Sequence, residues 1–408
     1  MTETGHNGSA PVAPRIIYSC FTRIGASGLG LEAWELLKGL DARGALVKGV
    51  FYGNRQRDIP AARLHIIRVH PFHLFSNFSS LYYYPLKRIY LDFVTSRIIE
   101  REGCDIFHGW TTESLRSIDA VQRIGGMAFL ERPSLHPLET RALLDEEYER
   151  FGVPLGRPPV HGWLSRIEAR ARELTVGVEE IARADRIIIQ SPYAAESFLQ
   201  HGVPKHKLAV IPRAVDTDHF RPPDHPPTDR TFRALFVGQL CLRKGIPYLL
   251  RAWTALRLRN AELVLLGPLH DDVKPLLAKL DDPSVRHVPW SDDTKAFYRG
   301  ASVFVLPSLV EGSAKVTYEA MACGLPVIVT PNAGSVARDR QEGFVVPIRD
   351  EGKIKDALLT LYENRELIVS YGRAARLAVE PYTWEHHRRI MWELYESAWR
   401  SHTQERQA

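Results

Sequence analysis

Two glutamates, Glu311 and Glu319, flank a short loop in the second half of the chain. The loop consists of Gly312, Ser313, Ala314 and Lys315. The apolar run at 302–306 predicts a buried strand before the loop, and residues 320–322 predict a helix after it. The N–H groups at a helix start bind anions, and each carboxylate accepts hydrogen bonds from hydroxyl groups. This layout suits a ligand with central negative charge and hydroxyl groups at both ends, such as a nucleotide diphosphate-sugar.

The segment at 307–328 resembles the donor-binding signature of the retaining GT-B glycosyltransferases of family 4. The residues that carry the match are Pro307, Glu311, Gly312, Glu319, Ala320, Gly324, Pro326, Val327 and, just beyond the segment, Gly334. In that family the first glutamate contacts the donor hexose and the second holds the ribose. The resemblance implies these roles for Glu311 and Glu319. Without it, two solvated glutamates on a surface helix would be the default interpretation.

A second turn, within 236–253, also follows a predicted strand and opens a predicted helix. The family carries a Gly-Arg turn here and a Lys-Gly pair some residues later. Lys244 and Gly245 fit this pattern, whereas Gln239 stands at the usual arginine. Arg243 is then the substitute cation. Cations at this turn could neutralise a diphosphate that gains charge as the sugar departs.

The first half has a glycine-rich loop at 25–30, after its first predicted strand. Its glycines allow a phosphate or a sugar to approach the backbone closely. The spacing is not that of a dinucleotide fingerprint, and 50–53 lacks the acidic residue that would hold a ribose. The resemblance implies that this loop, including Gly28, faces the donor phosphates and the acceptor.

Three residues are candidates for the catalytic group of the first half. Glu131 comes directly after a predicted strand and opens the segment ERPSLH, which resembles an ERGSSH-type motif of a subset of these transferases. His136 ends that segment, and His108 ends another predicted strand. Open α/β sheets bind ligands at the carboxyl ends of their strands. We rank His136 first, Glu131 second and His108 third, and the choice among them stays open.

Strands alternate with helices in both halves, which predicts mostly parallel sheets covered on both faces. The predicted strands of the first half are 16–20, 46–52, 65–69, 105–108, 127–130, 186–190 and 208–211. Those of the second half are 234–237, 263–266, 285–288, 303–306, 326–330 and 344–346. The resemblance implies an α/β GT-B fold, in which two Rossmann-like domains face across a cleft.

The domain boundaries follow from the same pattern. We expect an acceptor-side domain at 1–220, a proline-rich linker at 221–231, a nucleotide-sugar-binding domain at 232–380, and a helix at 381–408 that returns to the first domain. A chain of 408 residues is long enough for two domains of ordinary size.

Composition excludes several classes of protein. The net charge of +5 is modest, and no nucleic-acid module accompanies it. No apolar run approaches the roughly 18 residues that span a bilayer. The 4 cysteines are far apart without a CxxC pair, which favours a reducing compartment over a zinc site or disulfide frame. The polar start lacks a signal core, so we expect a cytoplasmic protein.

The stretch 70–90 combines aromatic residues with Lys87 and Arg88. It suits a membrane interface or an acceptor surface, or else an aromatic loop and helix packed inside the first domain. Peripheral attachment to the inner face of the plasma membrane is therefore a hypothesis.

Asp216 and Asp218 spell the metal-binding DxD of the unrelated GT-A glycosyltransferases. In the resembled family this point is interdomain structure, so we expect neither a metal nor a cofactor.

The sequence thus predicts a metal-independent, retaining hexosyltransferase of glycan biosynthesis. It would use a nucleotide diphosphate-sugar and a glycan or lipid-linked acceptor. The alternatives are a GT-B epimerase or phosphorylase, and a catalytically silent sugar-nucleotide-binding subunit.

Overall fold

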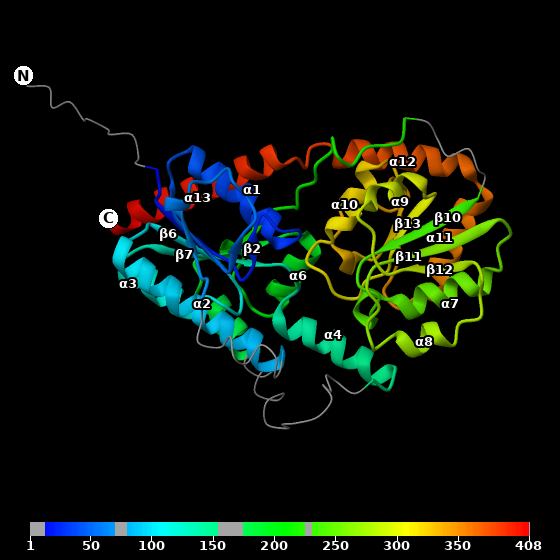
Figure 1. Cartoon of the computed structure of the whole chain (residues 1–408), viewed down its shortest axis with the longest axis horizontal. Coiled ribbons are helices and arrows are strands. Elements are labelled where there is room, and N and C mark those ends of the chain that lie inside the picture. Colours follow the sequence, from blue (N-terminus) through cyan, green and yellow to red (C-terminus); the bar gives the residue numbers. More distant parts are fainter. Residues whose placement is uncertain (1–12, 70–79, 154–173, 225–230, 408) are drawn as a thin grey trace, which may run out of the picture. The chain divides into compact units, whose positions relative to one another are not determined.

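The computed structural model describes residues 13–69, 80–153, 174–224 and 231–407 (Figure 1). They form two compact units, and neither unit is continuous in the sequence. The first is drawn from Met1–Glu131, His161–Ile188 and Arg388–Ala408, and the second from Arg132–Val160 and Ile189–His387. Each unit is made of separate segments, so the predicted domains, which are single continuous ranges, cannot be compared with it directly. The predicted domain boundaries therefore stay a prediction.

A 7-stranded sheet has the strand order β5-β3-β1-β6-β7-β8-β9. Its strand β1 (Ile16–Ser19) is parallel to β3 (Leu46–Phe51) on one side and to β6 (Ile106–Trp110) on the other. The chain first builds outward from β1 through β3 and later continues on the opposite side. Such a switch point leaves a ligand-binding crevice at the carboxyl ends of the strands.

The other elements that begin before residue 225 have the following bounds: β2 (Arg23–Ile24), α1 (Leu29–Ala42), β4 (Gly53–Asn54), η1 (Ala61–Arg63), β5 (Leu64–Ile66), α2 (Ser80–Glu102), α3 (Leu115–Arg123), β7 (Met127–Arg132), α4 (Pro137–Arg150), β8 (Arg186–Ile189), α6 (Pro192–Gln200), η3 (Lys205–Lys207) and β9 (Leu208–Val210).

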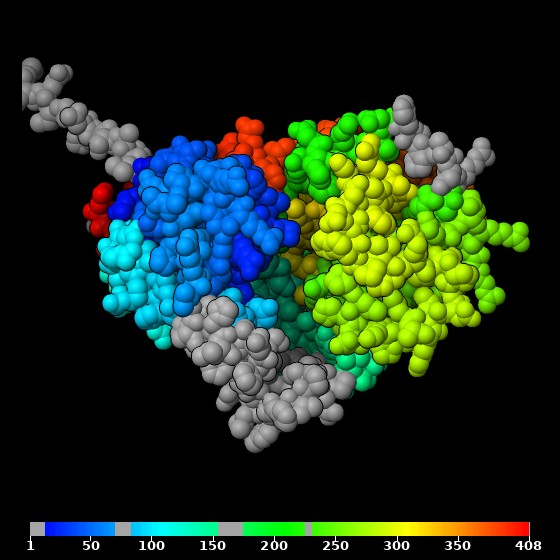
Figure 2. Space-filling model, in the orientation of Figure 1, coloured from blue at the N-terminus to red at the C-terminus, as the bar shows by residue number. Residues whose placement is uncertain are grey.

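A 6-stranded sheet in the second unit has the order β12-β11-β10-β13-β14-β15. Its strand β10 (Phe232–Val237) is parallel to β11 (Ala261–Leu266) and to β13 (Val303–Leu306). This sheet therefore has its own switch point, between β10 and β13. The segment around residue 300, yellow in Figure 2, forms part of the surface on the face shown.

The remaining elements have the following bounds: η4 (Leu242–Lys244), α7 (Ile246–Leu256), α8 (Lys274–Ala278), β12 (Val285–Val288), α9 (Thr294–Gly300), α10 (Lys315–Ala322), β14 (Val327–Val329), η5 (Pro331–Ala333), β15 (Gly343–Val345), α11 (Glu351–Glu363), α12 (Arg365–Val379) and α13 (Trp384–Gln407).

Polar caps fix the starts of several helices. The Ser191 side chain accepts a hydrogen bond from the Ala194 N–H at the start of α6. Asp293 and Asp350 cap α9 and α11 in the same way. Each cap satisfies an N–H group that has no acceptor inside the helix.

The predicted alternation of strands and helices is confirmed, and all 4 cysteines are buried and free. The predicted position of His108 at a strand end is wrong. Strand β6 continues to Trp110, which pairs with Glu131, so His108 lies inside the strand and is completely buried. The predicted linker falls partly on 225–230, outside the described residues.

Candidate functional site

The loops that follow β10 and β13 meet at the switch point of the second sheet. Gly245 ends the first loop with a φ of 71°, and a Cβ at this position would lie 2.1 Å from the Pro307 carbonyl oxygen. Only glycine combines this backbone conformation with this close approach. The two loops are therefore locked together, which brings Lys244 beside Glu311.

Two cations bind one oxygen of Glu311. The Oε1 atom lies 2.7 Å from Lys244 Nζ and 2.5 Å from Arg243 Nη1. Burial raises the pKa of Glu311, but Lys244 and Arg243 outweigh this effect and hold the pKa below its ordinary value. Glu311 is thus an ionised carboxylate. Arg243 lies beside Lys244 at this carboxylate, and its role as the substitute cation stays a prediction.

Arg213 is a third cation of this group, and the sequence interpretation missed it. Its Nε atom donates to the carbonyl oxygen of Ser313 at 2.6 Å. Burial lowers the pKa of Arg213 to about 10, although Tyr318 and Glu311 both raise it. The only sequence signal was an arginine shortly after the predicted strand at 208–211.

Backbone packing encloses Gly312 on several sides. A Cβ here would lie 2.5 Å from the carbonyl carbon of Pro133. The Gly312 carbonyl accepts a hydrogen bond from Ser191 Oγ at 2.5 Å. Gly334 also packs tightly against Gly312, because a Cβ added at Gly334 would lie 2.3 Å from the Gly312 carbonyl oxygen. The loop after β13 is therefore held by segments far away in the sequence.

The predicted transition from loop to helix is confirmed, but helix α10 already begins at Lys315, which the sequence analysis assigned to the loop. Ala314 precedes it and provides no side-chain cap. Ser313 Oγ donates to the Gly334 carbonyl at 2.7 Å and so fixes the loop. The first N–H groups of a helix have no acceptor within it, so this start can receive an anion.

Glu319 lies one turn into α10. Its Oε2 atom accepts a hydrogen bond from the Tyr298 hydroxyl at 3.0 Å. Its Oε1 atom lies 3.5 Å from Lys315 Nζ. These contacts hold the carboxylate in place, as the binding of a hydroxyl-bearing ligand group requires. The side chain of Gln239, by contrast, is exposed.

His136 is enclosed within the second unit. Its Nδ1 atom accepts a hydrogen bond from the Leu138 N–H at the start of α4, and its ring stacks on that of His201 with 4.4 Å between centroids. Burial, followed by His201 and Arg132, lowers its pKa to about 4, so the ring is neutral at neutral pH. These contacts give His136 a structural role, and its predicted catalytic role stays a prediction.

The other predicted residues lie in the first unit. Glu131 Oε1 is 3.2 Å from Nε2 of His108, without the alignment of a hydrogen bond, and His108 Nδ1 bonds to the Tyr395 hydroxyl. Glu131 is thus part of a buried polar group. Gly28 precedes α1 with a φ of 72°, and a Cβ there would meet open space.

Asp216 acts as a local turn residue. Its Oδ1 atom accepts hydrogen bonds from the N–H groups of Asp218 and His219, at 3.1 and 2.8 Å. Across the described ranges, no cluster of histidine, cysteine and acidic side chains has the arrangement of a metal site.

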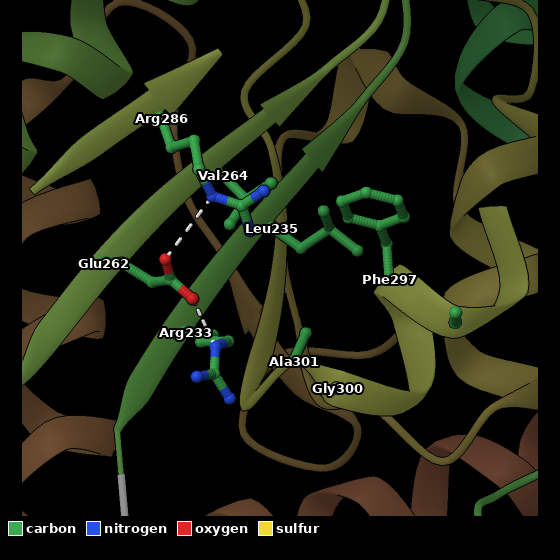
Figure 3. A pocket seen from close by; sticks show the side chains of 9 residues that line it. Arg233, Leu235, Glu262, Val264, Arg286, Phe297, Gly300 and Ala301 are labelled. Carbon is green, nitrogen blue, oxygen red and sulfur yellow. Dashed lines mark hydrogen bonds and ion pairs between the residues drawn. The ribbon is translucent and has the colours of Figure 1, made fainter. Parts of the chain in front are cut away.

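A separate cavity of about 360 Å³ lies against β10, β11, β12 and α9 (Figure 3). Glu262 lies there between Arg233 and Arg286, with 3.6 Å between its Oε2 and Arg286 Nε. The single carboxylate of Glu262 thus balances one of the two arginine charges. None of the predicted site residues lines the cavity.

Comparisons with known proteins match both halves of the chain. The family model "Glycosyltransferase Family 4" matches residues 26–219. The model "Glycosyl transferases group 1" matches residues 231–364. Together these matches include every strand of the 6-stranded sheet and every strand of the 7-stranded sheet except β1.

A similar curated protein is the D-inositol 3-phosphate glycosyltransferase of Pseudarthrobacter chlorophenolicus. It is 31% identical over 254 residues, which cover 57% of this chain and 60% of that protein. The chain thus spans little more than half the length of this curated relative.

Solved structures show the same fold over nearly the whole chain. A sucrose-phosphate synthase from Thermosynechococcus elongatus has a TM-score of 0.71 at 20% identity, over 95% of this chain and 99% of that one. Anabaena HepE, in complex with UDP and glucose, has a TM-score of 0.66 at 15% identity, over 94% and 100% of the two chains. The predicted GT-B fold is confirmed.

Proposed function

Because the chain belongs to the family 4 glycosyltransferases, we propose that it transfers a hexose-type sugar from a nucleotide diphosphate-sugar, with retention at the anomeric carbon. The acceptor is a glycan or a lipid-linked saccharide. The curated relative named after D-inositol 3-phosphate and the UDP complex of HepE support this class of reaction.

The observation that carries the proposal is the charge balance around Glu311. Lys244 and Arg243 bind this carboxylate, and Arg213 lies close enough to lower its pKa. Three positive charges against one negative charge leave a surplus of two. A diphosphate-sugar carries about two negative charges, so it matches this surplus. The start of α10 adds an electrostatic contribution of the same sign.

In the proposed mechanism, these cations stabilise the charge that the diphosphate gains as the sugar departs. All the described contacts of the Glu311 carboxylate use Oε1, and we assign Oε2 to a hexose hydroxyl. Glu319 holds the ribose, and Gly312, Ser313 and Ala314 contact the phosphates. The acceptor attacks the same face of the sugar, and the leaving phosphate helps to remove the acceptor's proton.

A panel of nucleotide sugars, incubated without acceptor, tests the proposal. One donor should bind and release nucleotide slowly, because water replaces the acceptor. The Lys244→Met variant should bind that donor more weakly, whereas Arg251→Met, which removes an exposed cation of α7, should not. Binding of no donor would refute the proposal. Tight binding with only background release would identify a silent binding subunit.

The proposal includes a cytoplasmic location and peripheral contact with anionic membrane. No helix within the described residues is both long enough and apolar enough to cross a bilayer. On α2, Lys87 and Arg88 make contacts within the first unit, so the exposed Tyr84 is the better probe of membrane insertion. Tyr84→Ala should weaken co-sedimentation with anionic vesicles. No vesicle binding at low salt would exclude the membrane contact.

A further inference from the structure

A group of aromatic rings surrounds a lysine at the switch point of the first sheet. Phe21 follows β1, Tyr52 follows β3, and Tyr83 and Lys87 lie on α2. Lys87 Nζ is 4.0 Å from the ring centroid of Tyr52, 5.0 Å from that of Phe21 and 5.1 Å from that of Tyr83. We call these residues the Lys87 cage.

The cage is held by hydrogen bonds to the backbone. The Tyr52 hydroxyl donates to the Lys87 carbonyl at 2.7 Å. The Phe21 N–H donates to Glu113 Oε1 at 2.8 Å, which anchors the loop after β1 to the loop after β6. The positions of the rings and the ammonium are thus fixed before any ligand arrives, which lowers the entropic cost of binding.

The positive charge of Lys87 has no carboxylate partner among the described residues. Burial lowers the pKa of Lys87, and the positive charge of Arg23 lowers it further. Both effects disfavour the charged form of Lys87 while no anion is bound. Burial also raises the pKa of Glu113 to about 8, so this carboxyl is mostly neutral at neutral pH. The site therefore carries net positive charge at a point where it is partly shielded from water.

Lys38 on α1 is an instructive contrast within the same unit. Its Nζ also lies over an aromatic ring, 4.6 Å from the centroid of Trp34. However, Glu35 Oε1 is 3.2 Å from that Nζ and compensates the charge. A cation on an aromatic ring is common in proteins, but a partly buried one without an anion calls for a ligand that supplies it.

We propose that the Lys87 cage is a subsite for an anionic sugar, whose phosphate or carboxylate pairs with Lys87 while its ring packs against Phe21 and Tyr83. The carboxyl ends of strands at a switch point are the usual ligand crevice of an open α/β sheet. Aromatic walls with few placed polar groups are typical of small-molecule sites. The assignment of this sugar as the acceptor rests on the proposed function.

Binding of soluble sugars tests the subsite without any transfer reaction. Glucose 6-phosphate and glucuronate should bind the wild-type protein at least about tenfold more tightly than glucose, because an added ion pair contributes on this scale. This preference should weaken with salt. Equal binding of glucose and both anionic sugars, measured by calorimetry or ligand-observed NMR, would overturn the proposal.

Variants separate the cage from general effects of charge. Lys87→Met and Lys87→Gln should abolish the preference for anionic sugars, whereas Lys87→Arg and the matched control Lys38→Met should keep it. The melting temperature and UDP binding should persist in all four variants. A preference that survives Lys87→Met would overturn the proposal.

Two further outcomes distinguish a failure of the proposed function from a failure of the proposed subsite. Binding of anionic sugars by a protein that binds no UDP or other nucleotide would leave the subsite standing and refute the proposed function. Lys87-dependent binding to phosphatidylglycerol vesicles, without binding of either anionic sugar, would overturn the subsite and assign the cage to a lipid headgroup.

Discussion

Lys244 Nζ and Glu311 Oε1 lie 2.7 Å apart, and both side chains are nearly buried, with exposed fractions of 10% and 13%. Arg243 binds the same oxygen. The carboxylate therefore holds two cations in place and keeps them from repelling each other while no donor is bound. This arrangement links the stability of the second unit to its capacity for binding an anion.

The first prediction concerns the energy of this ion pair. A double-mutant cycle with Lys244→Met and Glu311→Gln should give a coupling of roughly 0.5–3 kcal/mol in the free energy of unfolding, because the pair is shielded from water. The matched cycle at Arg251 and Glu351, a pair 3.8 Å apart and more than half exposed, should give a coupling near zero. Equal couplings from chemical denaturation would contradict the structural role of Glu311.

The second prediction separates the two glutamates in kinetics. Glu319→Ala should mainly weaken donor binding, because ribose contacts persist through the reaction. Glu311→Ala should mainly slow transfer, because the hexose changes as its bond to the phosphate breaks. Each loss should be roughly 1.5–3 kcal/mol. Tyr298→Phe removes only the hydroxyl that positions Glu319, so its loss should be smaller. Wild-type KM and kcat in both glutamate variants would refute the donor assignment.

The third prediction tests the close approach at Gly312. Gly312→Ala places a methyl group 2.5 Å from the carbonyl carbon of Pro133, so we expect a loss of about 1–3 kcal/mol in unfolding free energy and weaker donor binding. Gly300→Ala is the control, because a Cβ there meets nothing within 4 Å and Gly300 has no positive φ. If Gly312→Ala is no less stable than the control, the loop moves more freely than the structure indicates.

The sequence predicted the strand and helix pattern well, because buried parallel strands such as Val303–Leu306 are uninterrupted apolar runs. It also assigned Glu311, Lys244 and Arg243 to one donor site through the family motif, but it did not predict the ion pairs that join them. Arg213 was missed, and Lys87 was singled out without its partners Phe21 and Tyr52. Both omissions concern contacts between distant segments, and neither has a local periodicity or motif that indicates it. His108 was misplaced because the predicted strand ended at residue 108, whereas β6 continues to Trp110.

The fourth prediction is a pH dependence that originates at Glu113. Burial raises the pKa of this carboxyl from 4.5 to about 8, with Arg88 opposing the shift. The unfolded chain ionises Glu113 above about pH 4.5, whereas the folded chain keeps the proton until about pH 8. The wild-type protein therefore loses stability across this interval, at roughly 1.4 kcal/mol for each unit of pKa difference.

Glu113→Gln cannot ionise, so its stability relative to the wild type should increase by a few kcal/mol from about pH 5 to about pH 8. Urea denaturation at the two pH values measures the change. Glu149→Gln, on an exposed position of α4, should show no such increase. An unchanged difference between Glu113→Gln and wild type would mean that Glu113 is ionised in the folded protein.

The fifth prediction is that the reaction needs no divalent metal. Arg213, Arg243, Lys244 and the start of α10 supply the positive charge that a metal supplies elsewhere, so EDTA should leave the transfer rate largely unchanged. Asp216 Oδ1 accepts hydrogen bonds from the N–H groups of Asp218 and His219, so this segment forms a local turn and we expect it to bind no metal. Asp218→Asn should therefore retain activity. Lys244→Met should lose activity that magnesium or manganese does not restore. Complete loss of wild-type activity in EDTA, with recovery on adding either metal, would contradict the mechanism and return Asp216 and Asp218 to consideration as ligands.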